Sequence, residues 1–94
     1  MADAVDRNCF VLRNPFISGQ RMEGGAVLMD AATGECFELN RVGAEVWEQL
    51  ASDSDVAKVV SAVASRYGVA EDRVAADVRV LIDQMLARGI VRLK

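Results

Sequence analysis

The segment GECFELNRVGAEVWEQL, from Gly34 to Leu50, changes its hydrophobic period halfway along. In its first part Phe37 and Leu39 alternate with Cys36 and Glu38, and a two-residue alternation is the period of a β-strand. No linker separates this part from the second. We therefore predict a strand over residues 34–39 that runs directly into the next element.

The second part of the segment has the period of an α-helix. Its apolar positions recur at spacings of three and four residues: Gly43, Val46, Trp47 and Leu50. Asn40 stands at the junction, where its side-chain oxygen can accept a hydrogen bond from the amide of Val42 or Gly43. We predict a helix that starts after Asn40, ends near Ala51 and places Trp47 in the core.

Upstream, the sequence predicts further antiparallel strands. Residues 9–13 (CFVLR) form a short apolar run that stops at a turn signal, Asn14-Pro15. Residues 15–24 have no clear period. Residues 26–30 (AVLMD) predict a strand, and Gly34 can take the positive φ that closes a short hairpin to residues 35–40 (ECFELN). The first half of the chain is therefore expected to be a two- or three-stranded meander.

Downstream, two more amphipathic helices are expected. Asp55 suits the N-cap of the second helix and Gly68 its C-terminal end. The third helix should run from about Glu71 to Arg88, followed by a short final strand in residues 90–93. Three helices with one apolar stripe each can bury those stripes by packing together against one face of the meander. The predicted fold class is α+β: a small winged helix-turn-helix-like domain with an antiparallel three-stranded β-meander followed by three α-helices.

The composition fits a single domain over residues 1–94. The chain is 52% hydrophobic and 27% charged, so a packed core is expected. Residues 1–8 are polar and are predicted to be flexible, without the features of a signal peptide. No apolar run approaches the roughly 20 residues that span a membrane. We expect a cytoplasmic protein with no membrane partner, in which Cys9 and Cys36 are free thiols.

The residues of common catalytic sites are missing. The chain contains no His, which excludes Ser-His and Cys-His nucleophile systems. It also lacks the glycine motifs that bind phosphate groups. Two Cys without His make a poor metal site, since structural zinc uses four nitrogen or sulfur ligands. We expect no enzyme activity, no catalytic residue, no metal and no cofactor.

Some aromatic and Met side chains are further candidates for ligand contact. Tyr67 lies on an apolar stripe near a helix end, so we expect it in the core with its hydroxyl at the rim. Met22, Met29 and Met85 either fill the core or form an adaptable peptide-binding surface, and we favour core filling.

Taken together, these features resemble the PqqD-like family, which includes the recognition elements that bind leader peptides of ribosomally made, post-translationally modified peptides. The resemblance covers about residues 26–93. It rests on the Leu39-Asn40 junction, Gly43-Ala44, Trp47, Tyr67-Gly68 and the ending MLARGIV. The stand-alone B1 proteins of lasso-peptide pathways are especially similar in the hairpin at residues 28–40. The chain departs from the pattern at Ala70, where relatives often carry Asp or Ser as a helix cap.

The resemblance implies a function. A leader peptide would add as a strand to the last strand of the meander, and its side chains would enter a groove walled by the third helix. The implied partners are a precursor peptide and a separate modifying enzyme or leader peptidase, such as the transglutaminase-like cysteine protease of lasso-peptide biosynthesis. The peptide-binding residues expected on the strand are Gly34, Glu35, Cys36, Phe37, Glu38 and Leu39. Those expected on the helix are Arg73, Val74, Asp77, Val78, Leu81 and Gln84.

Two other functions stay open at the level of sequence. A winged-helix fold can bind DNA through its third helix. However, the chain has a net charge of -3 and its third helix is net acidic, so counterion release would be weak and no nucleic-acid partner is expected. The edge strand could also pair with a second copy of itself, which would make the chain a homodimeric assembly subunit.

Overall fold

The computed structural model describes residues 9–94, and the flexible segment predicted over residues 1–8 lies outside them. The elements in chain order are β1 (Val11–Arg13), β2 (Ile17–Met22), β3 (Gly25–Asp30), β4 (Cys36–Asn40), α1 (Arg41–Ser52), α2 (Val56–Tyr67), α3 (Glu71–Ala87) and β5 (Val91–Leu93). The predicted α+β class, with a three-stranded meander followed by three helices, is confirmed.

The meander consists of β2, β3 and β4, in that order across an antiparallel sheet. One edge of this sheet is therefore β4 and the other is β2. No period was detectable in the sequence of β2 because only its first residue, Ile17, is buried. A strand that exposes five of its six residues carries no apolar alternation to detect.

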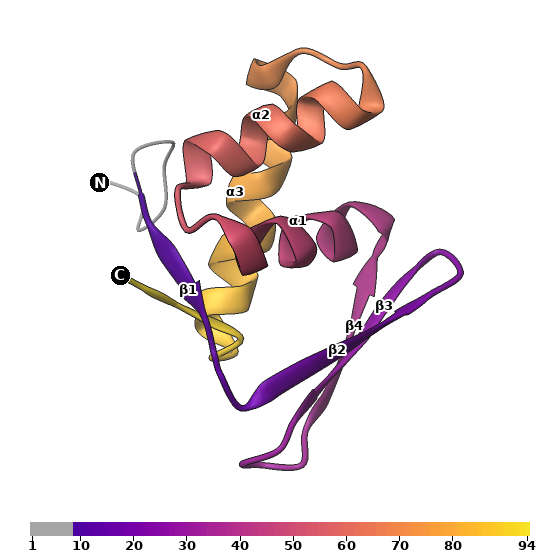
Figure 1. The fold of residues 1–94 in the computed structure, drawn as a ribbon, viewed down its shortest axis with the longest axis vertical. Helices are drawn as coiled ribbons and strands as arrows, with labels where there is room; N and C mark the ends of the chain where they lie inside the picture. The colour runs from indigo at the N-terminus through magenta and orange to yellow at the C-terminus, as the bar shows by residue number, and fades with distance from the viewer. Residues whose placement is uncertain (1–8) are drawn as a thin grey trace.

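The apolar run at the start of the described chain does not join the meander. Its strand, β1, pairs with the final strand, β5, in a separate two-stranded sheet, with Val11 opposite Leu93 and Arg13 opposite Val91. Figure 1 shows β1 beside the C-terminal strand, apart from β3 and β4. The short final strand predicted for residues 90–93 is thus confirmed.

The helices cover one face of the meander. The first helix, α1, packs on β3 and β4, while α2 and α3 pack on α1 from the other side (Figure 1). The predicted caps are present: the Asn40 side chain accepts from the Gly43 amide at 2.7 Å, and the Asp55 side chain accepts from the Ala57 amide at 3.0 Å. Gly68 ends α2 with a φ of 66°. Within residues 9–94, no helix is long and apolar enough to cross a membrane.

The core lies between α1, the inner face of the sheet and the other two helices. Its fully buried members include Leu28, Val46, Val60, Val78 and Ile82. The predicted burial of Trp47 is confirmed, since its side chain is 4% exposed.

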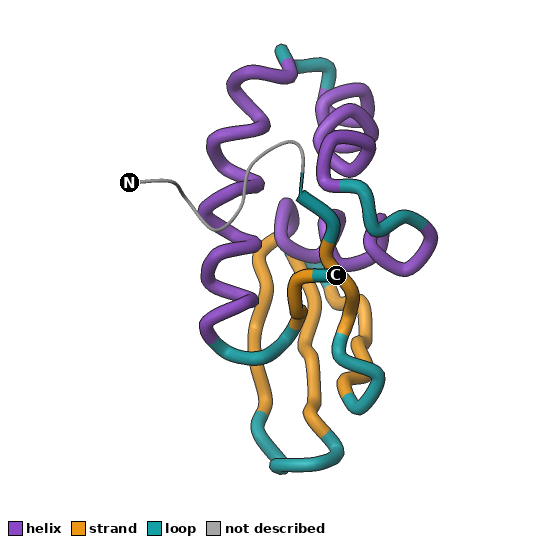
Figure 2. Tube along the Cα trace, turned by 90° about the vertical axis from the view of Figure 1, so that its left-hand side faces the viewer, coloured by secondary structure: helices purple, strands orange, loops and turns teal. Residues whose placement is uncertain are grey.

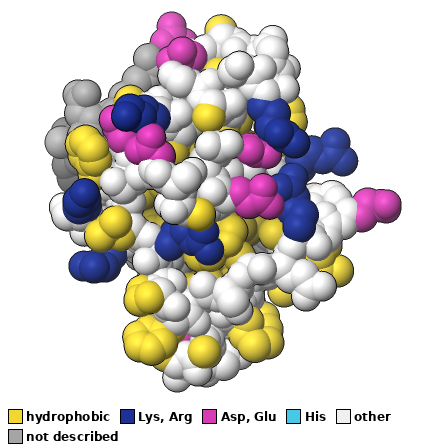
Figure 3. Space-filling model, viewed as in Figure 1, with side chains coloured by type: hydrophobic (Ala, Val, Ile, Leu, Met, Phe, Trp, Pro, Cys, Tyr) yellow, Lys and Arg dark blue, Asp and Glu magenta, His cyan; other side chains and the backbone are white. Residues whose placement is uncertain are grey.

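The opposite face of the sheet is open. Met22 and Met29 lie on it and are 53% and 52% exposed, so the prediction that they fill the core is wrong, whereas Met85 is buried as predicted. The reason is that α1 covers only one face, and strand alternation turns both Met side chains to the other. Tyr67, at 38% exposed, also lies on the surface rather than in the core. In Figure 3, hydrophobic side chains gather over the lower end of the molecule, where the strands of the sheet end.

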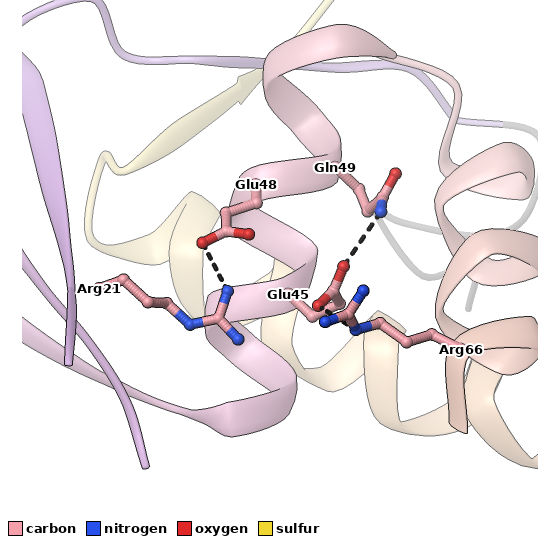
Figure 4. Close-up of polar contacts among 5 residues, drawn as sticks. All are labelled: Arg21, Glu45, Glu48, Gln49 and Arg66. Atoms are coloured by element: carbon pink, nitrogen blue, oxygen red, sulfur yellow. Dashed lines mark hydrogen bonds and ion pairs between the residues drawn. The ribbon is translucent and has the colours of Figure 1, made fainter. Parts of the chain in front are cut away.

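A buried carboxylate joins two helices. Glu45 of α1 is 3% exposed, and its Oε1 lies 3.0 Å from Nε of Arg66 on α2. The N–H of Arg66 is not aligned with Oε1, so this contact is an ion pair rather than a well-formed hydrogen bond. Oε2 of Glu45 accepts from the Gln49 side chain at 3.0 Å. One turn away, Glu48 accepts from Arg21 of β2 and raises the pKa of that guanidinium (Figure 4).

Candidate peptide-binding groove

The edge strand β4 begins later than predicted. It spans Cys36–Asn40, so Gly34 and Glu35, which we expected in the strand, lie in the loop before it. Gly34 has a φ of 80°, and its amide donates to the Asp30 carbonyl at 2.7 Å. Closing the hairpin therefore uses Gly34, as predicted from its freedom to take positive φ.

The backbone of β4 presents hydrogen-bonding groups to the outside. The Asp30 amide donates to the Glu35 carbonyl, and these residues are opposite each other in the register that pairs β3 with β4. Residues along an antiparallel strand bond alternately to one side and to the other. Counting from Glu35, Phe37 and Leu39 bond to β3, while the amides and carbonyls of Cys36 and Glu38 point away from the sheet.

The end of β4 is held in place. Asn40 is both its last residue and the N-cap of α1, so the strand cannot move independently of a packed helix. On the other side, β3 passes very close: a Cβ added to Gly25 would lie 1.9 Å from the Leu39 carbonyl oxygen. Only glycine permits this approach, and it fixes the separation of β3 and β4 at the start of α1.

A groove separates β4 from the C-terminal half of α3. It has a volume of about 180 Å³ and is lined by Phe37, Glu38, Leu39, Leu81, Gln84, Met85, Arg88 and Ile90. Figure 2 shows the edge strand of the sheet running alongside the lower part of α3. Five of these eight lining residues are apolar, and the other three are Glu38, Gln84 and Arg88. The volume is below the range of about 300–1,000 Å³ that small-molecule sites occupy, and suits a few side chains of a peptide.

The structure brings together five of the residues predicted from sequence. The groove contains Phe37, Glu38 and Leu39 from the strand and Leu81 and Gln84 from the helix. Cys36 lies on the same strand with its exposed side chain on the open face.

Other predicted helix residues lie elsewhere. Val74 and Val78 are 6% and 0% exposed, pack in the core and are not among the residues that line the groove. Arg73 and Asp77 are exposed on α3 but lie outside the groove lining. The predicted stripe on α3 therefore contains core residues, whereas other residues of the same helix line the groove.

Three residues of the groove were missed. Met85 and Arg88 follow Leu81 by four and seven residues, so helical spacing could have found them. Ile90 lies beyond the helix, and its amide donates to the Met85 carbonyl at 2.8 Å. This hydrogen bond turns the chain back across the end of the groove. No pattern in the sequence indicates this turn.

The electrostatics of the groove are simple. Glu38 belongs to the strand wall, but its side chain faces the open side of the sheet, whereas Arg88 belongs to the helix wall. Neither forms an ion pair with another residue of the described chain, 9–94. On the face seen in Figure 3, both basic and acidic side chains are present. Arg13, whose pKa is lowered by burial, lies over the Trp47 ring beside the other edge strand, β2, and does not contribute to the groove.

The fold and the groove define a small α+β domain that presents a free strand edge beside an apolar channel. The family model described as coenzyme PQQ synthesis protein D (PqqD) matches residues 25–91, and the chain belongs to this family. This confirms the resemblance seen in the sequence.

A solved structure described as "TbiB1 in Complex with the TbiA(beta) Leader Peptide" has the same fold. The two share a TM-score of 0.76 and 21% sequence identity, over 85% of this chain and 93% of that chain. No curated protein matches the chain.

Proposed function

We propose that this protein is a leader-peptide recognition element of a pathway that modifies ribosomally made peptides, with lasso-peptide biosynthesis as the first candidate. The leader lies as an added strand along β4 and places alternate side chains in the groove against α3. The observation that carries this proposal is the free edge of β4 beside an apolar groove. The solved relative with a bound leader peptide supports it.

Backbone pairing contributes only part of the affinity. The outward groups of Cys36 and Glu38, with the Asn40 amide, allow about four or five hydrogen bonds, worth about 0.5–1.5 kcal/mol each. Their sum is comparable with the association cost of about 4–15 kcal/mol. Apolar anchors in the groove, at about 1.5–3 kcal/mol each, must supply the rest. We therefore assign contact with the peptide first to Leu39 and Leu81, the partly buried apolar residues of the two groove walls.

The fixed position of β4 lowers the entropic cost of binding. Because β4 is already fixed by the Asn40 cap and by the close passage of Gly25, only the peptide becomes ordered on binding. Because the edge is pre-formed, less of the free energy from its hydrogen bonds is spent on ordering the protein, and more contributes to the affinity.

The domain acts as a binding module, and the chemistry belongs to a partner. We assign it the task of delivering the precursor to a separate modifying enzyme or leader peptidase, with a transglutaminase-like cysteine protease as the partner in a lasso-peptide pathway. We place this step in the cytoplasm, where ribosomes make the precursor and where a thiol such as that of Cys36 stays reduced.

Fluorescence anisotropy tests the proposal. The probe is a fluorescein-labelled leader segment of the short precursor encoded beside the gene for this chain. We expect a Kd in the micromolar range or tighter, and a scrambled peptide of the same composition as control should bind at least tenfold more weakly. Equal binding of the two peptides, or none at high micromolar protein, would overturn the proposal. Sedimentation of the free protein distinguishes peptide binding from pairing of β4 with a second copy.

A further inference from the structure

We infer that Glu38 and Arg88 set the register in which a peptide lies along β4. The groove then selects peptides that carry a basic residue beside Glu38 and an acidic residue beside Arg88. This inference rests on the proposed function and specifies which peptides the site accepts.

An apolar groove alone does not fix the register. Side chains of a bound strand alternate between the groove and the open face of the sheet, so a slip by one residue moves every anchor out of the groove. A slip by two residues restores the alternation and keeps apolar side chains in place. Some feature other than hydrophobicity must therefore distinguish registers that differ by two residues.

Glu38 is placed to make this distinction on the open face. Its neighbours Phe37 and Leu39 turn toward the helices, so its own side chain turns to the other face, where it is exposed. Its backbone groups point to the edge, so an added strand has one residue directly opposite it. Directly opposite residues share a face, and opposite charges in such pairs attract while like charges repel. A Lys or Arg at this one position of the peptide is favoured, and an acidic residue there is disfavoured.

Arg88 makes the second distinction on the helix wall. It follows the last residue of α3, and its own amide is bonded to the carbonyls of Gln84 and Leu86, which fixes its backbone. Its exposed side chain lines the groove opposite β4. An Asp or Glu that points from the peptide toward the helix can therefore pair with it, and guanidinium–carboxylate pairs are strong and directional.

The two charges lie on different sides of the bound strand, and this sets a rule for the peptide. The basic residue faces the open side and the acidic residue faces the groove side. Because strand side chains alternate, these two peptide residues must be separated by an odd number of positions. A peptide that slips by two residues keeps its apolar contacts but moves both charges away from their partners.

A display selection tests this inference and does not require the cognate leader to be identified. A library of random 12-residue peptides, each linked to its coding mRNA, is selected on the immobilised full-length chain and on the double variant Glu38→Lys/Arg88→Glu. The wild-type protein should enrich peptides with apolar residues at alternate positions and a basic and an acidic residue at an odd separation. The double variant should enrich the same apolar pattern with the two charges exchanged.

A second double variant, Glu71→Lys/Arg92→Glu, is the matched control. It makes the same charge changes at exposed residues that do not line the groove, and its selected peptides should match those of the wild-type protein. The affinity of a selected peptide for the charge-exchanged variant should fall by about 2- to 30-fold for each mismatched charge at low salt. This loss should shrink in 1 M NaCl, where the Debye length is about 3 Å.

The outcomes separate the two claims. The register inference would be overturned if the selected peptides had alternating apolar residues but no charge preference. It would also be overturned if the variant Glu38→Lys/Arg88→Glu selected the same charge order as the wild-type protein. Both results would leave the proposed function intact. Failure of both proteins to enrich any peptide above the bare matrix would contradict the proposed function itself.

Discussion

Leu39 of β4 and Leu81 of α3 line the same groove from opposite walls. Each is partly buried and packs against the core, so neither wall of the groove is free to collapse onto the other. Leu39 is further held by its neighbour Asn40, which caps α1. A peptide added to β4 therefore meets two fixed apolar surfaces, and both depend on the core beneath them.

Replacement of Leu81 by Asp should weaken binding of the labelled leader at least tenfold. The substitution removes an apolar contact and places a charge in the groove. An apolar side chain of the peptide would then lose burial that contributes about 1.5–3 kcal/mol to the free energy of binding. Anisotropy titration measures the affinity, and thermal unfolding followed by circular dichroism shows that the fold persists.

Val80→Asp is the matched control for this change. Val80 precedes Leu81 on α3, is 54% exposed and does not line the groove. Its substitution should leave the Kd within about twofold of the wild-type value, since the two variants differ only in which side of the helix carries the charge. Equal losses for both variants would show that the groove is not the binding surface.

Glu38→Pro should weaken leader binding about tenfold while the sheet stays folded. Pro removes an outward amide, which leaves one peptide carbonyl unpaired, and Pro is tolerated on edge strands where the lost N–H does not serve the sheet. Glu38→Ala is the control, because it removes the charge and keeps the amide. Identical affinities for the Pro and Ala variants would contradict strand addition along β4.

Arg66→Met should lower the free energy of unfolding by about 1–2 kcal/mol. The change leaves the buried Glu45 carboxylate without its cation, although Arg66 is itself 63% exposed and its contribution is reduced by solvent. Urea unfolding measures the difference.

Lys58→Met, on the same helix, provides the comparison for this loss of charge. Lys58 reaches Asp53 only at 3.9 Å and is 70% exposed, so its replacement should change stability by less than about 0.5 kcal/mol. A difference of less than about 0.5 kcal/mol between the two variants would show that the Glu45–Arg66 pair does not stabilise the packing of α1 on α2.

Gly19→Ala should destabilise the domain by about 1–3 kcal/mol, because the core has no room for the added methyl group. A Cβ at this position would lie 2.7 Å from Nε1 of Trp47 and 2.9 Å from Cδ2 of Leu28. Urea unfolding followed by Trp47 fluorescence reports the loss, since Trp47 is the single Trp of the chain. Ser18→Ala, at an exposed neighbouring position, should have little effect; a similar loss there would rule out the steric explanation.

Much of the fold follows from local signals in the sequence. The change of period at Leu39-Asn40 predicted both β4 and α1, since a strand alternation and a helical stripe cannot coexist in one element. The caps of α1 and α2 were predicted because Asn40 and Asp55 precede apolar stripes. The pairing of β1 with β5 was not predictable from such signals, because the two strands are short, and they are brought together only by the packing of α1 and α3.

The groove was only partly predictable for a similar reason. Helical spacing places Val74, Val78, Leu81 and Met85 along neighbouring rows, but the sequence does not show which row faces the core and which faces β4. That choice depends on how α3 crosses α1. The burial of Glu45 was also missed, since a Glu at a helical position is normally exposed. Its burial is made tolerable by the approach of Arg66 from α2 and by the hydrogen bond from Gln49.

Amide hydrogen exchange by NMR, with and without the leader peptide, tests the central claim most directly. In the free protein the amides of Phe37 and Leu39 should exchange slowly because they are bonded to β3, whereas those of Cys36 and Glu38 should exchange fast. Binding of the leader should slow exchange at Cys36 and Glu38 and leave the Arg21 amide, on the opposite edge strand β2, unchanged. Strand addition at β4 would be contradicted if saturating leader peptide slowed exchange of the Arg21 amide instead. It would also be contradicted if the Cys36 and Glu38 amides still exchanged fast in the presence of the leader.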